Sequence, residues 1–299
     1  MIPDRRSFLA ATAAMISLGP AALASKEKTM FRIGAIADVQ YADKADAPPH
    51  FYRAVKAKLQ AAVGELNRHD LGFVVHMGDF IDGGWENFTP IKAVAAECRH
   101  PWHFVLGNHD FNVADDKKLL VPQELGMPGR YYDFACGGWH FVVLDGNDQS
   151  TYAWPAGSTK ERAAQDLLKN TYPAGKLWNG AIGPQQAQWL ENILTATDGS
   201  GTPVALLCHF PIYPPGDENI PLWNAAAMVA AIEPHPSVKL WLNGHEHKGG
   251  YAEKAGIHYL NLCGMLDTEQ NAFAVLDFTP GKIVVHGYGR EPSRELTLR

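Results

Sequence analysis

The amino-acid sequence predicts an α/β fold in which parallel strands are connected by helices. Short runs rich in branched and aromatic apolar residues alternate with longer segments whose apolar residues recur at helical spacing. This alternation is typical of a parallel sheet that helices cover on both faces. In the last third of the chain the apolar runs lie close together without a helical segment between them, which predicts antiparallel pairing there.

The segments expected to be strands are short and rich in β-branched and aromatic residues. They are residues 31–37, 73–77, 102–106, 140–144, 204–208, 240–242, 258–262, 273–278 and 283–286. Apolar residues at helical spacing predict an amphipathic helix over 51–66. Further helices are expected at 184–194, where Pro184 suits a first helical turn, and at 223–232. Residues 146–182 are rich in Gly, Pro, Asn and aromatics and are expected to form a long, functional loop.

The first 24 residues are expected to be a signal peptide that precedes a single domain over 25–299. Arg5 and Arg6 stand before an apolar run over 8–18, and Ala22-Leu23-Ala24 supplies small residues for cleavage. The segment 4–9 resembles a twin-arginine signal, although Asp4 and Ala10 depart from the usual pattern. The twin-arginine export machinery is therefore an expected partner, and the expected location is periplasmic or secreted. A membrane anchor is the alternative, but the run is shorter than the ~20 residues of a spanning helix.

Charge and cysteine content narrow the classes of partner and of site. The formal net charge is −6, without the basic excess of nucleic-acid-binding proteins, so we expect no nucleic-acid polymer as a partner. The four cysteines form no C-x-x-C pair, which argues against a thiolate metal site. Free buried thiols are expected, with disulfides as the alternative.

Five polar motifs each follow a strand-like run. They are Asp38-Val39-Gln40, Gly78-Asp79, Gly107-Asn108-His109-Asp110, His209, and Gly244-His245-Glu246-His247. Because ligands bind at the carboxyl ends of strands in α/β sheets, we expect these motifs to meet at one edge. Taken singly, each motif is typical of a cap, a turn or a packing residue, and only their joint occurrence favours a site. The remaining histidines are expected to be surface or packing residues: His50, His69, His76, His100, His103, His140, His235, His258 and His286.

The side chains of these motifs are hard and borderline ligands, namely carboxylate, amide oxygen and imidazole. This set suits Mn²⁺, Fe or Zn²⁺ and lacks the thiolates of softer sites. Two divalent ions about 3.5–4 Å apart activate a water molecule and hold the oxygens of a phosphoryl group. A carboxylate between them offsets their repulsion, and Asp79 is the candidate for this bridge.

The five motifs resemble those of the calcineurin-like metallophosphoesterase superfamily, whose pattern is D-x-H, G-D, G-N-H-[DE], H and G-H-x-H. The one departure is Gln40, where most members have histidine. Other segments resemble the manganese-dependent ADP-ribose/CDP-alcohol diphosphatase family. They include residues 36–43, 51–53, 144–150, 179–180, 209–214, 249–251, 259–264 and 287–290.

This resemblance implies a four-layer αββα sandwich of two mixed β-sheets flanked by helices, with two metal ions at the sheet edges. It implies that the first metal is held by Asp38, Gln40, Asp79 and His247. It implies that the second metal is held by Asp79, Asn108, His209 and His245. His109 would not bind metal but would protonate the leaving oxygen or donate a hydrogen bond to the phosphoryl group, and it would be oriented by Asp110. The amide of Gln40 would weaken the first site, so the resemblance implies dependence on added Mn²⁺.

The implied reaction is attack of a metal-activated hydroxide on the phosphoanhydride of a nucleoside diphosphate conjugate, such as ADP-ribose or a CDP-alcohol. The alternatives are a cyclic-nucleotide phosphodiesterase, a phosphomonoesterase, or a binding scaffold without activity. Arg53 lies in a segment that carries the resemblance and is a candidate for binding the substrate. Tyr152, Trp154, Tyr213 and Trp223 are candidates for stacking on a base, and loop packing is the alternative for them.

Overall fold

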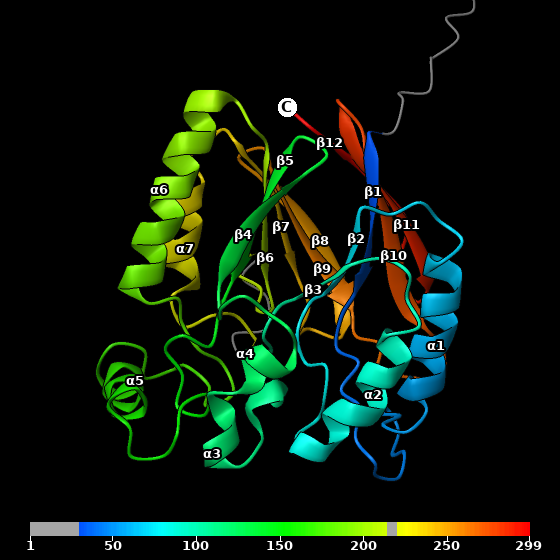
Figure 1. The fold of residues 1–299 in the computed structure, drawn as a ribbon. Coiled ribbons are helices and arrows are strands. Elements are labelled where there is room, and N and C mark those ends of the chain that lie inside the picture. The colour runs from blue at the N-terminus through cyan, green and yellow to red at the C-terminus, as the bar shows by residue number, and fades with distance from the viewer. Residues whose placement is uncertain (1–29, 214–219) are drawn as a thin grey trace, which may run out of the picture.

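The computed structural model describes residues 30–213 and 220–299, which form two six-stranded β-sheets packed face to face (Figure 1). Helices α1 (Val55–Leu66) and α2 (Phe88–Ala95) lie outside the first sheet. Helices α6 (Pro184–Ser200) and α7 (Ala225–Ile232) lie outside the second. This arrangement confirms the four-layer αββα sandwich. The signal peptide expected over 1–24 lies outside the described residues.

The first sheet is mixed and has the strand order β12-β11-β10-β1-β2-β3. Its strands are β1 (Phe31–Ile36), β2 (Phe73–His76), β3 (Trp102–Phe104), β10 (Ala272–Phe278), β11 (Lys282–Gly289) and β12 (Arg294–Thr297). Strands β1, β2 and β3 are parallel, whereas β10, β11 and β12 pair antiparallel. The switch between the two modes falls at the β1–β10 pair and agrees with the antiparallel end expected from the sequence.

The second sheet has the order β4-β5-β6-β7-β9-β8 and is parallel in its centre. Its strands are β4 (Tyr132–Cys136), β5 (Trp139–Leu144), β6 (Val204–Cys208), β7 (Val238–Asn243), β8 (Lys248–Lys254) and β9 (Ile257–Cys263). Strands β4 and β8 pair antiparallel at its two edges. The carboxyl ends of the parallel strands of both sheets lie at the lower edge of Figure 1, where the loops gather.

Most central strands are apolar on both faces because each sheet is covered on both sides. In β2, Phe73 and Val75 pack between the two sheets, while Val74 packs against the helix layer. The alternation of side chains along a strand explains this division. All four cysteines are free, as expected, and Cys208 and Cys263 are buried. Within the described residues, no helix combines the length and apolar character needed to cross a membrane.

The prediction of a long loop over 146–182 is wrong in its middle part, where helix α5 (Thr159–Asn170) forms. Only Ala164 of this helix is buried, and most of its residues are polar, so its few apolar residues at helical spacing are a weak signal. A different signal was present, because the Ser158 side chain caps the helix by accepting the N–H of Glu161 at 3.2 Å. The helix expected from 51 begins at Val55. Helices not anticipated are α2 and the short segments η1 (Trp85–Asn87), η2 (His109–Phe111), α3 (Asp115–Lys118) and α4 (Val121–Glu124).

Candidate metal centre

The five motifs come together where strands of both sheets end. Asp38 follows β1, and its N–H donates to the carbonyl of Gly78 after β2 at 3.2 Å. In the second sheet, the N–H of Gly244 after β7 likewise donates to the carbonyl of His209 after β6 at 3.1 Å. The N–H of His245 donates to both oxygens of the Asp38 carboxylate, at 3.2 and 3.1 Å. This contact between the His245 N–H and the Asp38 carboxylate therefore fixes the ends of the two sheets against each other.

His209 is the centre of one cluster of ligand atoms. Its Nδ1 lies 2.8 Å from the carbonyl of Met77, so Nδ1 carries the proton and the lone pair is on Nε2. That Nε2 lies 3.2 Å from Asn108 Oδ1 and 3.2 Å from Asp79 Oδ2. It also lies 3.1 Å from Nδ1 of His245.

The second imidazole of the cluster is oriented in the same sense. Nε2 of His245 lies 3.0 Å from Oδ1 of Asn179, so this N–H donates and the Nδ1 lone pair faces His209. Lone pairs of two imidazoles, a carboxylate and an amide oxygen thus face a common point, an arrangement that a cation stabilises. Burial alone would lower the pKa of His209, but the Asp79 carboxylate raises it to about 9, so positive charge is favoured here. The donor set fits the second metal implied by the sequence.

A second cluster surrounds His247. Its Nε2 lies 3.5 Å from Oδ1 of Asp38, and its Nδ1 lies 2.9 Å from Oδ1 of Asp267. A carboxylate behind a histidine fixes the tautomer and strengthens the facing nitrogen as a metal ligand. The side chain of Gln40 contacts Asp79, donating from Nε2 to its Oδ2 at 2.9 Å. His50 was expected to be a surface or packing residue, yet its Nε2 lies only 3.6 Å from Asp267.

The backbone at the centre adopts left-handed conformations that ordinary residues avoid. Asp38, Gln40, Asp79 and His245 have φ angles of 52°, 44°, 58° and 70°. Such conformations cost on the order of 1–3 kcal/mol each and persist where the surroundings enforce them. The side chains of Asp38 and Gln40 are therefore presented by turns and not by an extended strand.

The expected role of Asp110 is wrong in the structure. Its buried carboxylate does not orient the imidazole of His109 but accepts four backbone N–H groups. These belong to Asp79 at 3.1 Å, Phe80 at 2.8 Å, Ile81 at 3.3 Å and Gly107 at 2.9 Å. His109 is oriented by Asp82, whose carboxylate forms an ion pair with Nδ1 of the imidazole. Burial would lower the pKa of His109, but the carboxylates of Asp79 and Asp82 raise it.

A cavity of about 370 Å³ opens beside Asn108 and His109. Tyr152 lines it, and the Tyr152 hydroxyl donates to Oδ1 of Asn147 at 2.6 Å. Trp178 also lines the cavity with 48% of its surface exposed, although it was not among the residues predicted to bind substrate. Its signal was weak, because one tryptophan in a segment rich in Gly, Pro and aromatics has no periodic partner.

The other expected substrate-binding residues do not line this cavity. The guanidinium of Arg130 covers the ring of Trp154 at 4.3 Å. Tyr213 packs against Tyr259, with ring centroids 5.0 Å apart. Arg53 is exposed, and its Nε lies 2.8 Å from Oδ1 of Asp43. Trp223 lines a separate hollow with Tyr172, so of the five candidates only Tyr152 lines the cavity beside His109.

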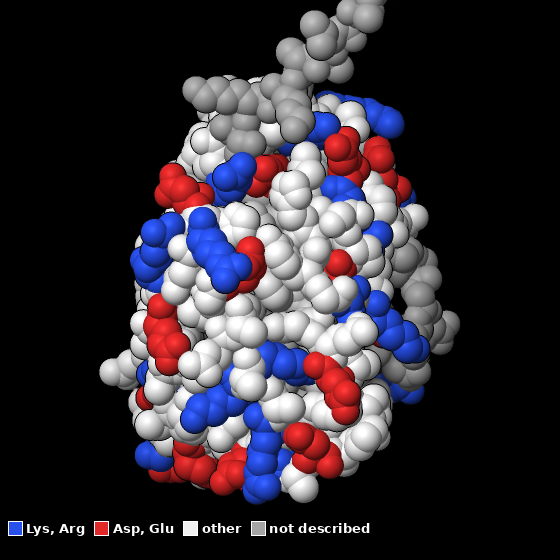
Figure 2. All heavy atoms as spheres, turned by 90° about the vertical axis from the view of Figure 1, so that its right-hand side faces the viewer, with Lys and Arg blue, Asp and Glu red and all other residues white. Residues whose placement is uncertain are grey.

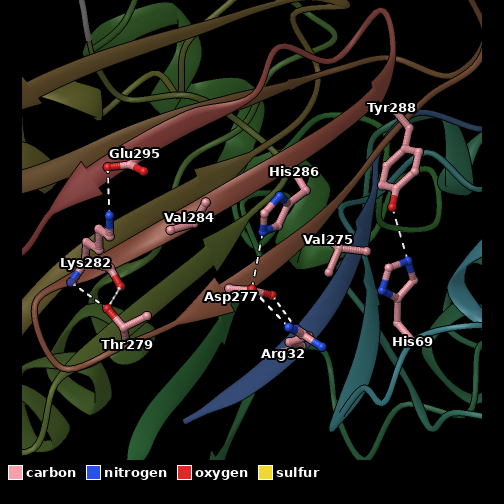
Figure 3. Close-up of a pocket in the computed structure, with 10 residues that line it drawn as sticks. All are labelled: Arg32, His69, Val275, Asp277, Thr279, Lys282, Val284, His286, Tyr288 and Glu295. Carbon is pink, nitrogen blue, oxygen red and sulfur yellow. Dashed lines mark hydrogen bonds and ion pairs between the residues drawn. The ribbon is translucent and has the colours of Figure 1, made fainter. Parts of the chain in front are cut away.

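A larger hollow of about 630 Å³ lies on the outer face of β10 and β11 and contains none of the five motifs (Figure 3). Its charged groups are paired with one another: Arg32 lies 2.6 Å and His286 3.3 Å from Asp277. Lys282 likewise lies 2.9 Å from Glu295. Figure 2 shows acidic and basic side chains interspersed over this side of the molecule. The hollow therefore offers no concentrated charge comparable to the metal centre.

Comparison with known proteins agrees with this geometry. The model of the calcineurin-like phosphoesterase family matches residues 31–249. A manganese-dependent ADP-ribose/CDP-alcohol diphosphatase of Arabidopsis thaliana is 33% identical over 304 residues, which cover 89% of this chain and 96% of that protein. The protein of the same name from Homo sapiens is 28% identical, with 94% of this chain and 96% of that protein covered. The solved structure of a dimetal phosphatase from Danio rerio has a TM-score of 0.82 at 27% identity and covers 91% of this chain and 100% of that one.

Proposed function

The chain belongs to the calcineurin-like phosphoesterase family and is a metal-dependent phosphohydrolase, and from this premise we propose that it hydrolyses nucleoside diphosphate conjugates. The scissile bond is the phosphoanhydride of compounds such as ADP-ribose or a CDP-alcohol, and the metal is manganese. One observation carries the proposal. The ligand atoms of Asp79, His209 and His245 lie within 4.8 Å of one another, and the neighbouring Asn108 and His109 line a cavity of about 370 Å³ that could hold part of a nucleotide conjugate.

The bound divalent ions would supply an activated water molecule and positive charge for the phosphoryl oxygens. The protein supplies the positions. The side chains of Asp38, Gln40, Asp79 and His247 would hold the first ion, and those of Asp79, Asn108, His209 and His245 the second. The backbone N–H of His109 donates to Oδ1 of Asp79 at 2.8 Å, which keeps the His109 ring at the boundary between centre and cavity. There the imidazole protonates the leaving oxygen, with Asp82 holding its Nδ1.

The cavity also supports a substrate that extends beyond the reacting phosphoryl group. It is lined by the aromatic side chains of Phe111, Tyr152 and Trp178. Aromatic rings beside a phosphate-binding centre suit the flat base of a nucleotide. A small phosphomonoester would leave this cavity empty, and a binding scaffold would not need a coordinating side chain at every ligand position.

A substrate panel with added Mn²⁺ tests the proposal. ADP-ribose and CDP-choline are expected to show higher kcat/KM than cyclic AMP or p-nitrophenyl phosphate and to release a nucleoside monophosphate. A preference for cyclic AMP would favour a cyclic-nucleotide phosphodiesterase. A preference for the aryl phosphate would favour a phosphomonoesterase. An Asp79→Asn protein that kept full turnover would place the activity elsewhere on the chain.

We further propose that the protein is exported in folded form through the twin-arginine machinery and acts in the periplasm or outside the cell. The support is the sequence alone, with Arg5-Arg6 before the apolar run 8–18 and the small residues ending at Ala24. Fractionation of cells should place the protein outside the cytoplasm, with Ser25 at its new N-terminus. Replacing both arginines by lysine should retain it inside. Unprocessed, cytoplasmic wild-type protein would contradict this assignment.

A further inference from the structure

Lys58 of α1 is a buried lysine whose ammonium group reaches a distant segment. Only 7% of its surface is exposed, although lysine is rarely buried without an acidic partner. Its partners are instead backbone carbonyls of four successive residues. Nζ donates to the carbonyl of Met265, and the carbonyls of Leu266, Asp267 and Thr268 lie 3.4, 3.5 and 2.8 Å away. Burial lowers the pKa of Lys58 to about 8, because the charged ammonium group loses its contact with water here. The backbone carbonyls must therefore take the place of the lost water.

The same segment is held from its other side by Arg290. Its Nη2 donates to the carbonyl of Gly264, and its backbone N–H donates to the carbonyl of Asn271 at 2.8 Å. Asn271 in turn donates from Nδ2 to the carbonyl of Lys58 at 2.7 Å. Two cations from separate elements therefore fix the carbonyls of residues 264–268.

This segment contacts the ligands of the first metal. The N–H of Leu266 donates to the carbonyl of Asp38 at 2.9 Å, and the Asp267 carboxylate lies 2.9 Å from Nδ1 of His247. Gly264 lies so close to the His247 ring that an added Cβ would stand 2.7 Å from its Cγ. The histidines of the second metal are oriented by other groups, the Met77 carbonyl for His209 and the Asn179 side chain for His245.

We propose that Lys58 is a positioning residue for the first metal site. By holding the carbonyls of residues 265–268, its ammonium group places Asp267 behind His247, so that Nε2 of His247 faces Asp38. The inference rests on the proposed two-metal centre. It predicts that loss of Lys58 weakens one metal site and leaves the other intact.

The test is a Mn²⁺ titration of wild-type and Lys58→Met proteins, with free Mn²⁺ measured by electron paramagnetic resonance. The wild type is expected to bind two ions. In Lys58→Met, the affinity of one site should fall by about 10–100-fold, the effect typical of losing a group that orients a ligand. Lys92→Met is the matched control, because Lys92 Nζ also donates to a backbone carbonyl, that of Glu124 at 2.6 Å, but far from the centre. Both of its sites should bind as in the wild type.

The possible outcomes separate the two levels of the argument. A wild type that binds fewer than two ions would overturn the two-metal centre, and this inference with it. If folded Lys58→Met binds Mn²⁺ at both sites as tightly as the wild type, or loses affinity equally at both, the role of Lys58 is refuted while the two-metal centre stands. If Lys58→Met does not fold, Asp267→Asn provides the same test, since its amide keeps the size but not the charge behind His247. Unchanged affinities in Asp267→Asn would likewise overturn the proposal.

Discussion

Replacement of Asp110 by asparagine separates a structural role from a chemical one. The sequence places Asp110 next to His109, as though it served the imidazole. In the structure its two oxygens accept the N–H groups of Asp79, Phe80, Ile81 and Gly107. These bonds hold the turn in which Asp79 adopts a φ of 58°. We therefore expect the Asp110→Asn substitution to reduce folding stability through this turn, and not to act mainly by changing the orientation of His109.

The size of the effect follows from the bonds that asparagine cannot make. One of the two oxygens becomes an NH₂ group, which leaves two buried N–H groups without an acceptor. Each such group costs about 1–3 kcal/mol, or about 2–6 kcal/mol together. Burial and the Asp79 carboxylate raise the pKa of Asp110 to about 7, so removing its charge relieves part of this cost. We expect the free energy of unfolding of the metal-free protein to fall by about 2–4 kcal/mol.

Urea unfolding in the presence of a chelator, followed by far-UV circular dichroism, measures this change. His109→Asn is the control, because it removes the imidazole but none of the four bonds to Asp110. Because Lys44 still pairs with Asp82 in this variant, its stability should fall less than that of Asp110→Asn while its kcat falls. Wild-type stability in Asp110→Asn, together with a loss of kcat, would refute the reasoning and restore the role of orienting His109.

Other expectations concern the metal, the imidazole, the cavity and acid stability. Exhaustive chelation should abolish activity, and added Mn²⁺ should restore it. At a Mn²⁺ concentration 100 times Kd, binding should stabilise the fold by about 2.7 kcal/mol. Full activity after chelation would contradict the proposed metal centre. Asp82→Asn should lower kcat by about 10–100-fold without changing Mn²⁺ affinity, because it releases the imidazole of His109; a change in Mn²⁺ affinity instead would count against that role. Trp178→Ala should raise KM for ADP-ribose but not for p-nitrophenyl phosphate, and an equal effect on both would remove the stacking idea. Burial lowers the pKa of His103 from 6.5 to about 4, so the unfolded chain takes up a proton first as the pH falls. The contribution of the neutral, buried His103 to folding stability is thus present above about pH 6.5 and lost toward about pH 4. Urea midpoints should fall less in His103→Phe than in the wild type over this window, and parallel curves would contradict it.

The fold was predictable where one physical signal dominated. Strands β1, β2 and β6 are buried on both faces, so their apolar runs stand out in the sequence. Exposed elements lack this signal. Helix α5 buries only Ala164, and β8 carries Lys, Gly and Glu along an edge of its sheet. For such elements the local signals are caps and turns, which the apolar pattern does not report.

The same difference between local and distant signals explains what was found and missed at the centre. A metal ligand at a strand end is recognisable because its neighbours in sequence, such as Gly78 before Asp79, form the turn that presents it. The groups that orient the ligands have no such neighbours. Asp267 lies 20 positions from His247, Asn179 lies 66 positions from His245, and each is defined only by the nitrogen that it faces. Any segment that passes behind the metal centre can supply an orienting group. Which segment does so depends on how the two sheets pack, and no sequence motif marks it. Substitution of these partners should therefore change the affinity of one metal at a time, whereas substitution of the bridging Asp79 should change both.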